Sequence, residues 1–368
     1  MQRFTVPTTI SRSALRALAL LVSGSLLGCG GSGPPDGPND QLPPPVTLTG
    51  SAAGSGQQPS GAPSRRPPCP AGTRRDLATQ SCTSTDCAAT DQHSWRRRFN
   101  ANGSGTEADR IVLAPDHTII MVGDLSDDLF LRTRPLAKPD HVLRNNGLSD
   151  LFVTKLDPAG QLLWSRHFGG RDQQYGADVA VDGAGHIIVT GELHGTMTFG
   201  GPTLASAGES DLYFAKLDAD GRHLWSKSFG NPKTQYRPRV ATLSDGRIVL
   251  TGFFYGPLDV GGGAMASNDG NSFVALYQPD GRLLWSMGLG SGGPMVQALA
   301  VDSDDHIVIF GDFARPIELA PMPPLQPVGM RDLFLAKLDS QGRARWRKRF
   351  GKVPTANQHA HSLAIDGD

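Results

Sequence analysis

Apolar and polar residues alternate at the start of a unit that begins at Asp178. The run 178-DVAVDGAGHIIVTGEL-193 alternates into a turn and leaves it through β-branched residues, which predicts a β-hairpin. A second hairpin is predicted where 211-DLYFAKLD-218 and 222-RHLWSKSF-229 flank a short turn that ends in Gly221. Glycine can take the positive φ that such a turn needs. The two hairpins predict four strands in about 60 residues.

This unit recurs along the chain. The third-strand pattern returns as 150-DLFVTKLD-157, 271-NSFVALYQ-278 and 332-DLFLAKLD-339, and the first hairpin returns as 298-ALAVDSDDHIVIFGDF-313. The chain has five tryptophans, and the intervals between the last four are 61, 60 and 61 residues. We expect all five to pack between neighbouring units: Trp95, Trp164, Trp225, Trp285 and Trp346.

A four-stranded antiparallel unit repeated at a fixed period predicts an all-β fold, a β-propeller, over residues 93–368. Each such sheet is apolar on both faces and must be covered by its neighbours. Glycines that follow apolar runs, Gly123, Gly191, Gly252 and Gly311, are expected to allow close backbone approach or a bulge in the second strand. The predicted complete blades are residues 104–168, 173–229, 234–289 and 294–350, and residues 357–368 are a partial one.

The predicted ring is incomplete. The segment Trp95–Phe99 matches a fourth strand with no earlier strands before it, and 361-HSLAIDGD-368 matches a first strand that stops inside its turn. A closed propeller usually has four to eight blades. The hypothesis from the sequence is therefore that this is a piece of a longer propeller.

Three elements carry a resemblance to a known family: Asp-Leu-Phe-x-x-Lys-Leu-Asp, Gly-x-x-x-Trp with Phe-Gly, and Ala-Val-Asp-x-x-Gly-x-Ile-x-Val-x-Gly. Over residues 93–368 the chain resembles the bacterial β-propeller repeats called SBBP, which occur in exported and lipid-anchored proteins. The Leu-Asp-x-x-Gly-x-x-x-Trp element is also similar to the quinoprotein-type propeller repeat. The SBBP resemblance implies a fold and a cell-surface context but no defined activity, so it assigns no catalytic residue.

The N-terminal residues 1–28 are predicted to be a lipoprotein signal peptide. Three arginines without an acid precede the apolar run 17-ALALLVSGSLLG-28, which is too short for a membrane span. The run ends in Leu26-Leu27-Gly28-Cys29, which resembles the lipobox of bacterial lipoproteins, and this implies that Cys29 is lipidated. The alternative is an ordinary signal peptide in which Cys29 is incidental. Because Gly30 rather than Asp follows, the analogy favours the outer membrane as the destination.

Residues 29–68 are rich in Pro, Gly and Ser and are predicted to be a disordered tether. A short segment, residues 69–92, then carries Cys69, Cys82 and Cys87. In an exported protein these are candidates for a disulfide, and the alternative is a zinc site with His93 as a fourth ligand. Three is an odd number, so a disulfide leaves one thiol without a partner among them.

Charge and motifs exclude several functions. Lysine plus arginine equals aspartate plus glutamate, at 35 each, so no net field attracts nucleic acid. No Gly-x-Ser-x-Gly, His-Glu-x-x-His or P-loop pattern occurs. The acidic turns lack a complete calcium loop and are interpreted as turns. His117, His186, Arg247 and His306 are interpreted as equivalent, exposed turn positions without a metal. We therefore predict no nucleic-acid partner, cofactor, metal site or catalytic residue.

The segments that differ most between units are those joining the second strand to the third and the fourth to the next first strand. In a propeller these loops share one face. Loop variation on a constant scaffold is how binding surfaces are built, although drift in unused loops gives the same pattern. We therefore expect a non-catalytic binding or scaffolding module, exported and anchored to the membrane, with a protein or polysaccharide ligand at the cell surface. The alternative is an enzyme in the propeller funnel, a hydrolase or a quinone-dependent oxidoreductase.

Overall fold

The computed structural model describes residues 73–75, 82–84, 100–101, 106–131, 141–267, 269–290, 292–351 and 358–365. The chain divides into two units, Met1–Arg96 and Arg97–Asp368. In the first unit, β1 (Thr73–Arg75) pairs antiparallel with β2 (Cys82–Ser84). None of the described residues forms a helix, so none forms one long and apolar enough to cross a membrane.

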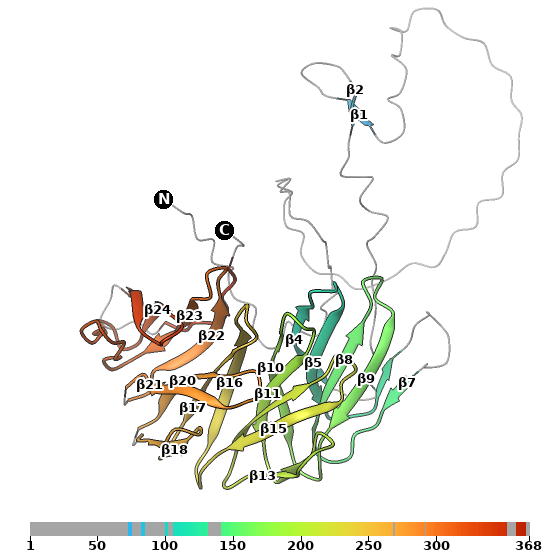
Figure 1. The fold of residues 1–368 in the computed structure, drawn as a ribbon, viewed down its shortest axis with the longest axis horizontal. Coiled ribbons are helices and arrows are strands. Elements are labelled where there is room, and N and C mark those ends of the chain that lie inside the picture. Colours follow the sequence, from blue (N-terminus) through green and yellow to red (C-terminus); the bar gives the residue numbers. More distant parts are fainter. Residues whose placement is uncertain are drawn as a thin grey trace, which may run out of the picture. The chain divides into compact units, whose positions relative to one another are not determined.

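The second unit is built from four sheets, each with four antiparallel strands in the order of the sequence (Figure 1). Blade 1 consists of β4 (Glu107–Leu113), β5 (Ile119–Leu125), β8 (Asp150–Leu156) and β9 (Leu162–Phe168). Blade 2 consists of β10 (Gln174–Val181), β11 (Ile187–Leu193), β14 (Asp211–Leu217) and β15 (His223–Phe229). Blade 3 consists of β16 (Gln235–Thr242), β17 (Ile248–Phe254), β20 (Asn271–Tyr277) and β21 (Leu283–Gly288). Blade 4 consists of β22 (Met295–Val301), β23 (Ile307–Phe313), β24 (Asp332–Leu338) and β25 (Ala344–Phe350). These sheets confirm the predicted all-β propeller fold.

Shorter strands decorate the loops between the second and third strands of the blades. In blade 1, β6 (Leu129–Leu131) and β7 (His141–Leu143) of this loop form a three-stranded sheet with β3 (Asn100–Ala101), which precedes the blade. Blade 2 carries β12 (Thr196–Met197) with β13 (Leu204–Ala205), and blade 3 carries β18 (Leu258–Asp259) with β19 (Ala264–Met265). Blade 4 has only a bridge between Ile317 and Leu325 at this place. The described part of 357–368, where a partial blade was predicted, contains no strand.

The strands of a blade are apolar on both faces because both faces are covered. In β11, Ile187 and Val189 pack in a cluster with residues of blade 1, whereas Ile188 packs in a cluster with residues of blade 3. All seven residues of β14 are buried. Alternate side chains of a strand point to opposite faces of its sheet, so a continuous apolar run is what a sheet between two neighbours requires.

The repeated tryptophan bonds each blade to the next. The indole nitrogens of Trp164, Trp225 and Trp285 donate to the carbonyl oxygens of Ala219, Pro279 and Ser340, at 3.1, 3.1 and 3.0 Å. Each acceptor lies in the turn between the third and fourth strands of the following blade. The turn glycine, for example Gly221 with φ of +75°, lies so close to the preceding blade that a β-carbon would crowd the Trp164 ring. The repeated Asp-x-x-Gly turn and tryptophan therefore form one interface.

The second-strand glycines mark a close backbone approach to the first strand. A β-carbon on Gly123 or Gly191 would collide with the carbonyl oxygen of Glu107 or Tyr175, respectively. The first strand is irregular at the same level, with register shifts at 108/110 in β4 and 176/178 in β10. This fits the close approach expected at these glycines, although the bulge lies in the first strand and not in the second. The first strands β4, β10, β16 and β22 are the innermost ones.

Candidate functional site: an acidic belt at the loop end of the blades

Each blade has hairpin turns at one end and connecting loops at the other. Hairpin turns join strand one to strand two and strand three to strand four at one end, which we call the turn end. The loops from strand two to strand three, and from each blade to the next, lie at the other end, which we call the loop end. The side chains of the candidate site described below lie near the innermost strands at the loop end.

Several residues singled out in the sequence lie outside the described residues, namely Cys29, Cys69, Cys87 and Trp95. Cys82 is the first residue of β2, and its side chain is not described. Trp164, Trp225 and Trp285 lie at the three blade interfaces, and Trp346 lies on the outermost strand of blade 4.

The interpretation of four equivalent histidine and arginine positions is wrong for His117. His117 has a φ of +62° and donates its N–H to Ala114, as Gly185 with φ of +81° does to Asp182. The position equivalent to His186 is therefore Thr118. Histidine tolerates the left-handed region better than most residues, which lets it take the place of the turn glycine.

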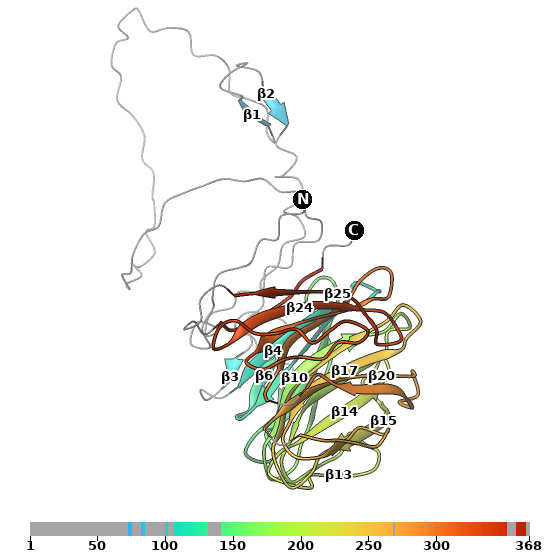
Figure 2. The ribbon, with the colours of Figure 1, turned by 90° about the vertical axis from the view of Figure 1, so that its left-hand side faces the viewer.

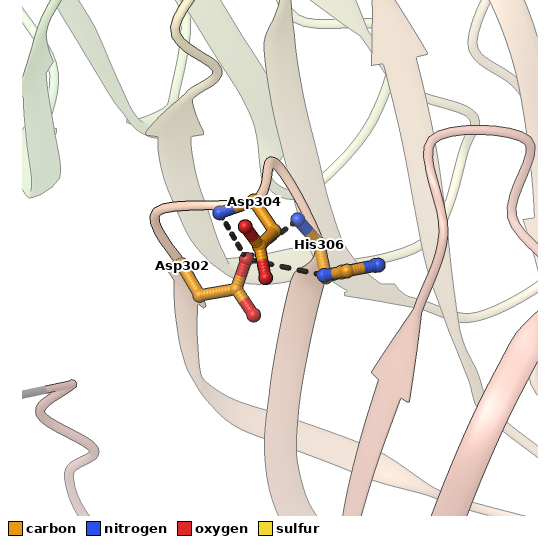
Figure 3. Close-up of side chains that lie close together, drawn as sticks. All are labelled: Asp302, Asp304 and His306. Atoms are coloured by element: carbon orange, nitrogen blue, oxygen red, sulfur yellow. Dashed lines mark hydrogen bonds and ion pairs between the residues drawn. The ribbon is translucent and has the colours of Figure 1, made fainter. Parts of the chain in front are cut away.

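At the turn end of blade 4, Asp302, Asp304 and His306 bring three candidate metal ligands together (Figure 3). The Asp302 carboxylate, however, accepts the backbone N–H groups of Asp304 and His306 at 3.0 and 2.9 Å, and the Lys337 ammonium lies 2.5 Å from its other oxygen. Although burial opposes it, these interactions hold the pKa of Asp302 at about 2. Blade 2 repeats the arrangement with Asp182, His186 and Lys216. The Lys337 and Lys216 ammonium groups already pair with these carboxylates, in the place that a metal ion would take. We therefore interpret the two clusters as interactions that close the turns.

At the loop end, acidic residues follow the second-strand glycines and reach the next blade. The Asp124 carboxylate accepts the N–H of Gly176 at 2.7 Å, and the Glu192 carboxylate accepts the N–H of Arg237 at 3.0 Å. Both N–H groups belong to the irregular segment of the following first strand. Each acid thus bonds two blades together at the loop end of the innermost strands, a place that we call the mouth.

The belt continues through blades 3 and 4 with a different composition. The equivalent position in blade 3 is Phe253, which is buried. The Arg237 guanidinium bonds the Gln297 side-chain oxygen at 3.0 Å, and the Gln297 amide donates to Asp312 at 3.2 Å. Asp312 also pairs with Arg331. We call Asp124, Glu192, Arg237, Gln297 and Asp312 the loop-end belt.

The acidic part of the belt is confined to blades 1 and 2. Burial, together with the nearby carboxylates of Asp109, Glu107 and Glu192, raises the pKa of Asp124 to about 8. Burial also raises the pKa of Glu192, although Arg237 partly opposes this. A carboxyl group with such a pKa lacks a sufficient cationic partner in the folded protein. A ligand that brings a positive charge would supply it.

Aromatic side chains border these acids. Tyr175 lies opposite Glu192 in the sheet, and its ring meets that of His194 edge-on at 6.0 Å. On blade 3, the rings of Tyr236, Phe253 and Tyr255 form a cluster with centroids 5.0 to 6.4 Å apart. Burial raises the pKa of Tyr236 to about 12, so its hydroxyl stays protonated. Such rings offer flat contact surfaces for a ligand at the mouth.

A cavity of about 340 Å³ lies among the innermost strands. Its polar lining is an ion pair in which the Arg110 Nε atom lies 3.2 Å from the Asp178 carboxylate. Asp178 also accepts the N–H of Val240 at 3.0 Å, and the Arg239 Nε donates to the carbonyl of Gln297 at 3.0 Å. These bonds join blades 1 to 2, 2 to 3 and 3 to 4. The polar groups of the cavity are therefore engaged in holding the blades together.

Sequence reasoning missed the loop-end belt. Its signal was present, because Gly123, Gly191 and Gly311 are each followed by an acid. An acid after a strand glycine is also an ordinary surface residue, and only the structure shows that the carboxylates of Asp124 and Glu192 turn inward to the next blade. The long loops themselves were identified correctly as the connections from strand two to strand three.

Comparisons with known proteins place the chain in a family. A family model described as "Outer membrane protein assembly factor BamB" matches residues 150–359, which is more than half of the chain. An uncharacterized WD repeat-containing protein, L264 of Acanthamoeba polyphaga mimivirus, is 27% identical over 208 residues, covering 46% of this chain and 15% of its own length. Regulatory protein FlaEY of Caulobacter vibrioides is 25% identical over 184 residues, covering 49% and 19%. The chain thus spans less than a fifth of these relatives.

Among solved structures, the WD40 domain of Neurospora crassa Pan2 matches with 12% identity and a TM-score of 0.32. This match covers 68% of the present chain and 71% of the Pan2 domain.

Proposed function

Because this chain belongs to the family described as outer membrane protein assembly factor BamB, we propose that it is a non-catalytic binding or scaffolding module of the cell envelope. The description of the family supports an envelope role. The lipobox resemblance at Leu26–Cys29 supports export and a lipid anchor on Cys29 in the outer membrane, with residues 29–68 as the tether. The folded part then presents its loop end to a ligand.

The observation that carries the binding site is the group of acids at the loop end, where Asp124 lies opposite Glu107 in the sheet and its pKa is raised. Burial and the nearby carboxylates disfavour the ionised form of Asp124 in the free protein. A cationic group placed beside it gains a charge-assisted hydrogen bond and relieves that repulsion. With Tyr175 and Tyr236 beside the acids, the mouth suits a polypeptide segment that carries lysine or arginine. The ligand we propose is therefore a basic segment of another envelope protein.

A fluorescein-labelled decalysine peptide tests this proposal, with binding measured by fluorescence anisotropy at low salt. We expect the Asp124→Asn/Glu192→Gln double variant to bind roughly tenfold more weakly than the wild type. The control is Asp220→Asn/Asp280→Asn, which removes the same charge from exposed turn-end residues. Equal affinities of the two double variants would overturn the proposal.

The pH dependence gives a second, independent readout. Between pH 6 and 9 the wild type should bind decalysine more tightly as Asp124 ionises, because its pKa of about 8 lies within this range. The single variant Asp124→Asn should lack this increase. An identical pH profile in the wild type and the variant would place the peptide elsewhere on the molecule.

A further inference from the structure

Blades 1 and 2 each present the same set of donors to the blade that follows, whereas blade 3 keeps only Trp285 of this set, because Leu276 and Met287 stand at the two basic positions. From blade 1, the Trp164 indole nitrogen and the Lys155 ammonium both reach the carbonyl of Ala219, and Arg166 reaches the next carbonyl, that of Asp220. From blade 2, Trp225 and Lys216 both reach the carbonyl of Pro279, and Lys227 reaches that of Gly281 at 2.6 Å. One turn of the following blade thus receives three donors from one face.

Blade 4 retains the whole set. Lys337, Trp346 and Lys348 stand at the positions of Lys155, Trp164 and Arg166, as the pairing of Lys337 with Trp346 and of Lys155 with Trp164 shows. Among the described residues, no carbonyl accepts the Trp346 indole. Among the same residues, the Lys337 ammonium pairs with Asp302 of its own blade, and the Lys348 ammonium lies 5.8 Å from the Trp346 ring centre. Within the described part of the chain, these donors therefore have no acceptor turn.

The same face is more exposed than its equivalents in blades 1 and 2. Phe350 is 45% exposed, whereas the equivalent Phe168 and Phe229 are each 8% exposed at blade interfaces. The Lys337 side chain is 26% exposed, against 9% for Lys155 and 5% for Lys216. Strand β25 lies at an edge of its sheet, and in Figure 2 no other labelled strand of this unit lies beyond it. We call Lys337, Trp346, Lys348 and Phe350 the open face of blade 4.

The path of the chain after blade 4 also points to a further sheet. Ser362 and Leu363 line the axial cavity together with Ala298 and Leu299 of β22. The sequence 362-SLAID-366 repeats the innermost-strand sequence 298-ALAVD-302. The chain therefore reaches the level of the innermost strands beside blade 4, where the first strand of another blade would lie.

We propose that the open face of blade 4 docks a further four-stranded blade that presents an Asp-x-x-Gly turn between its third and fourth strands. The turn supplies the two carbonyl acceptors that Trp346, Lys337 and Lys348 lack, and its glycine lets the backbone approach the indole ring. The recognition element is the turn together with the apolar face of its hairpin.

A cyclic peptide that closes the hairpin 211–229 provides the probe, because the face of blade 1 binds this turn in the structure. Binding of the fluorescein-labelled peptide to the full chain is measured by anisotropy. We expect Trp346→Phe and Lys337→Met each to weaken binding roughly tenfold, as loss of a buried hydrogen bond does. A peptide with Gly221→Val should bind still more weakly, since a side chain there would meet the indole and strain the turn.

The control variant is Arg345→Gln, an exposed neighbour on β25 whose side chain points to the other face of the sheet. It should bind the peptide as the wild type does. Equal affinity of the wild type and Trp346→Phe, or of the two peptides, would overturn the proposal. A wild-type dimer in analytical ultracentrifugation that Trp346→Phe abolishes, without peptide binding, would also overturn it and identify a second copy as the occupant.

Discussion

Replacing Asp124 with asparagine should remove part of the pH dependence of folding stability. The ordinary pKa of this carboxyl is 3.8, and burial with its acidic neighbours raises it to about 8 in the folded chain. Between these values the folded state holds a proton that the unfolded state has released, so stability is lost as the pH rises. The slope is about 1.4 kcal/mol per pH unit for one group. From pH 5 to pH 7, Asp124 alone should therefore lower the free energy of unfolding by about 3 kcal/mol.

Urea denaturation followed by tryptophan fluorescence at pH 5, 6 and 7 measures this loss. The asparagine side chain still accepts the N–H of Gly176, so the variant keeps the contact between blades 1 and 2. Between pH 5 and pH 7, the free energy of unfolding of the wild type should fall by about 3 kcal/mol more than that of Asp124→Asn. Asp280→Asn, in an exposed turn, serves as the control and should follow the wild type. Parallel pH profiles for the wild type and Asp124→Asn would refute a raised pKa.

Three further changes test the interfaces and the anchor. Trp225→Phe should lower the free energy of unfolding by about 1–2 kcal/mol through the lost bond to Pro279, whereas Trp346→Phe should change it little, as urea denaturation would show. Lys216→Met leaves the buried Asp182 without its ammonium and should cost about 3–5 kcal/mol, and Lys155→Met should cost less because the Asp116 side chain is 57% exposed. Radiolabelled palmitate should enter the wild type but not Cys29→Ser.

Much of the fold follows from short-range patterns in the sequence. The alternation around Asp182 and the turn before Arg222 specify hairpins locally, and repetition requires the hairpins to stack. The spacing of Trp164, Trp225 and Trp285 counts the interfaces that the structure contains. Their hydrogen-bond acceptors lie 54 or 55 residues away, in the next unit, so no local pattern reveals them.

The loop-end belt could not be derived in the same way. Whether an acid is solvated or turned inward depends on the irregular first strand of the next blade. There the N–H groups of Gly176 and Arg237 are the ones that bond the two carboxylates. The misplacement of His117 has a related cause. Matching residues by identity aligned it with His186, whereas the backbone places it where other turns have a residue with positive φ.

The position after the second-strand glycine explains why the acidic charge is one-sided. Blade 3 has Phe253 there and contributes no carboxylate, and Asp312 of blade 4 is neutralised by Arg331. Uncompensated acid therefore remains on blades 1 and 2, near Asp124, whereas the open face with Trp346 belongs to blade 4. Since the two surfaces share no residue, substitutions in them should act additively. The Asp124→Asn/Glu192→Gln variant should thus keep its affinity for the cyclic hairpin, and Trp346→Phe should keep its affinity for decalysine.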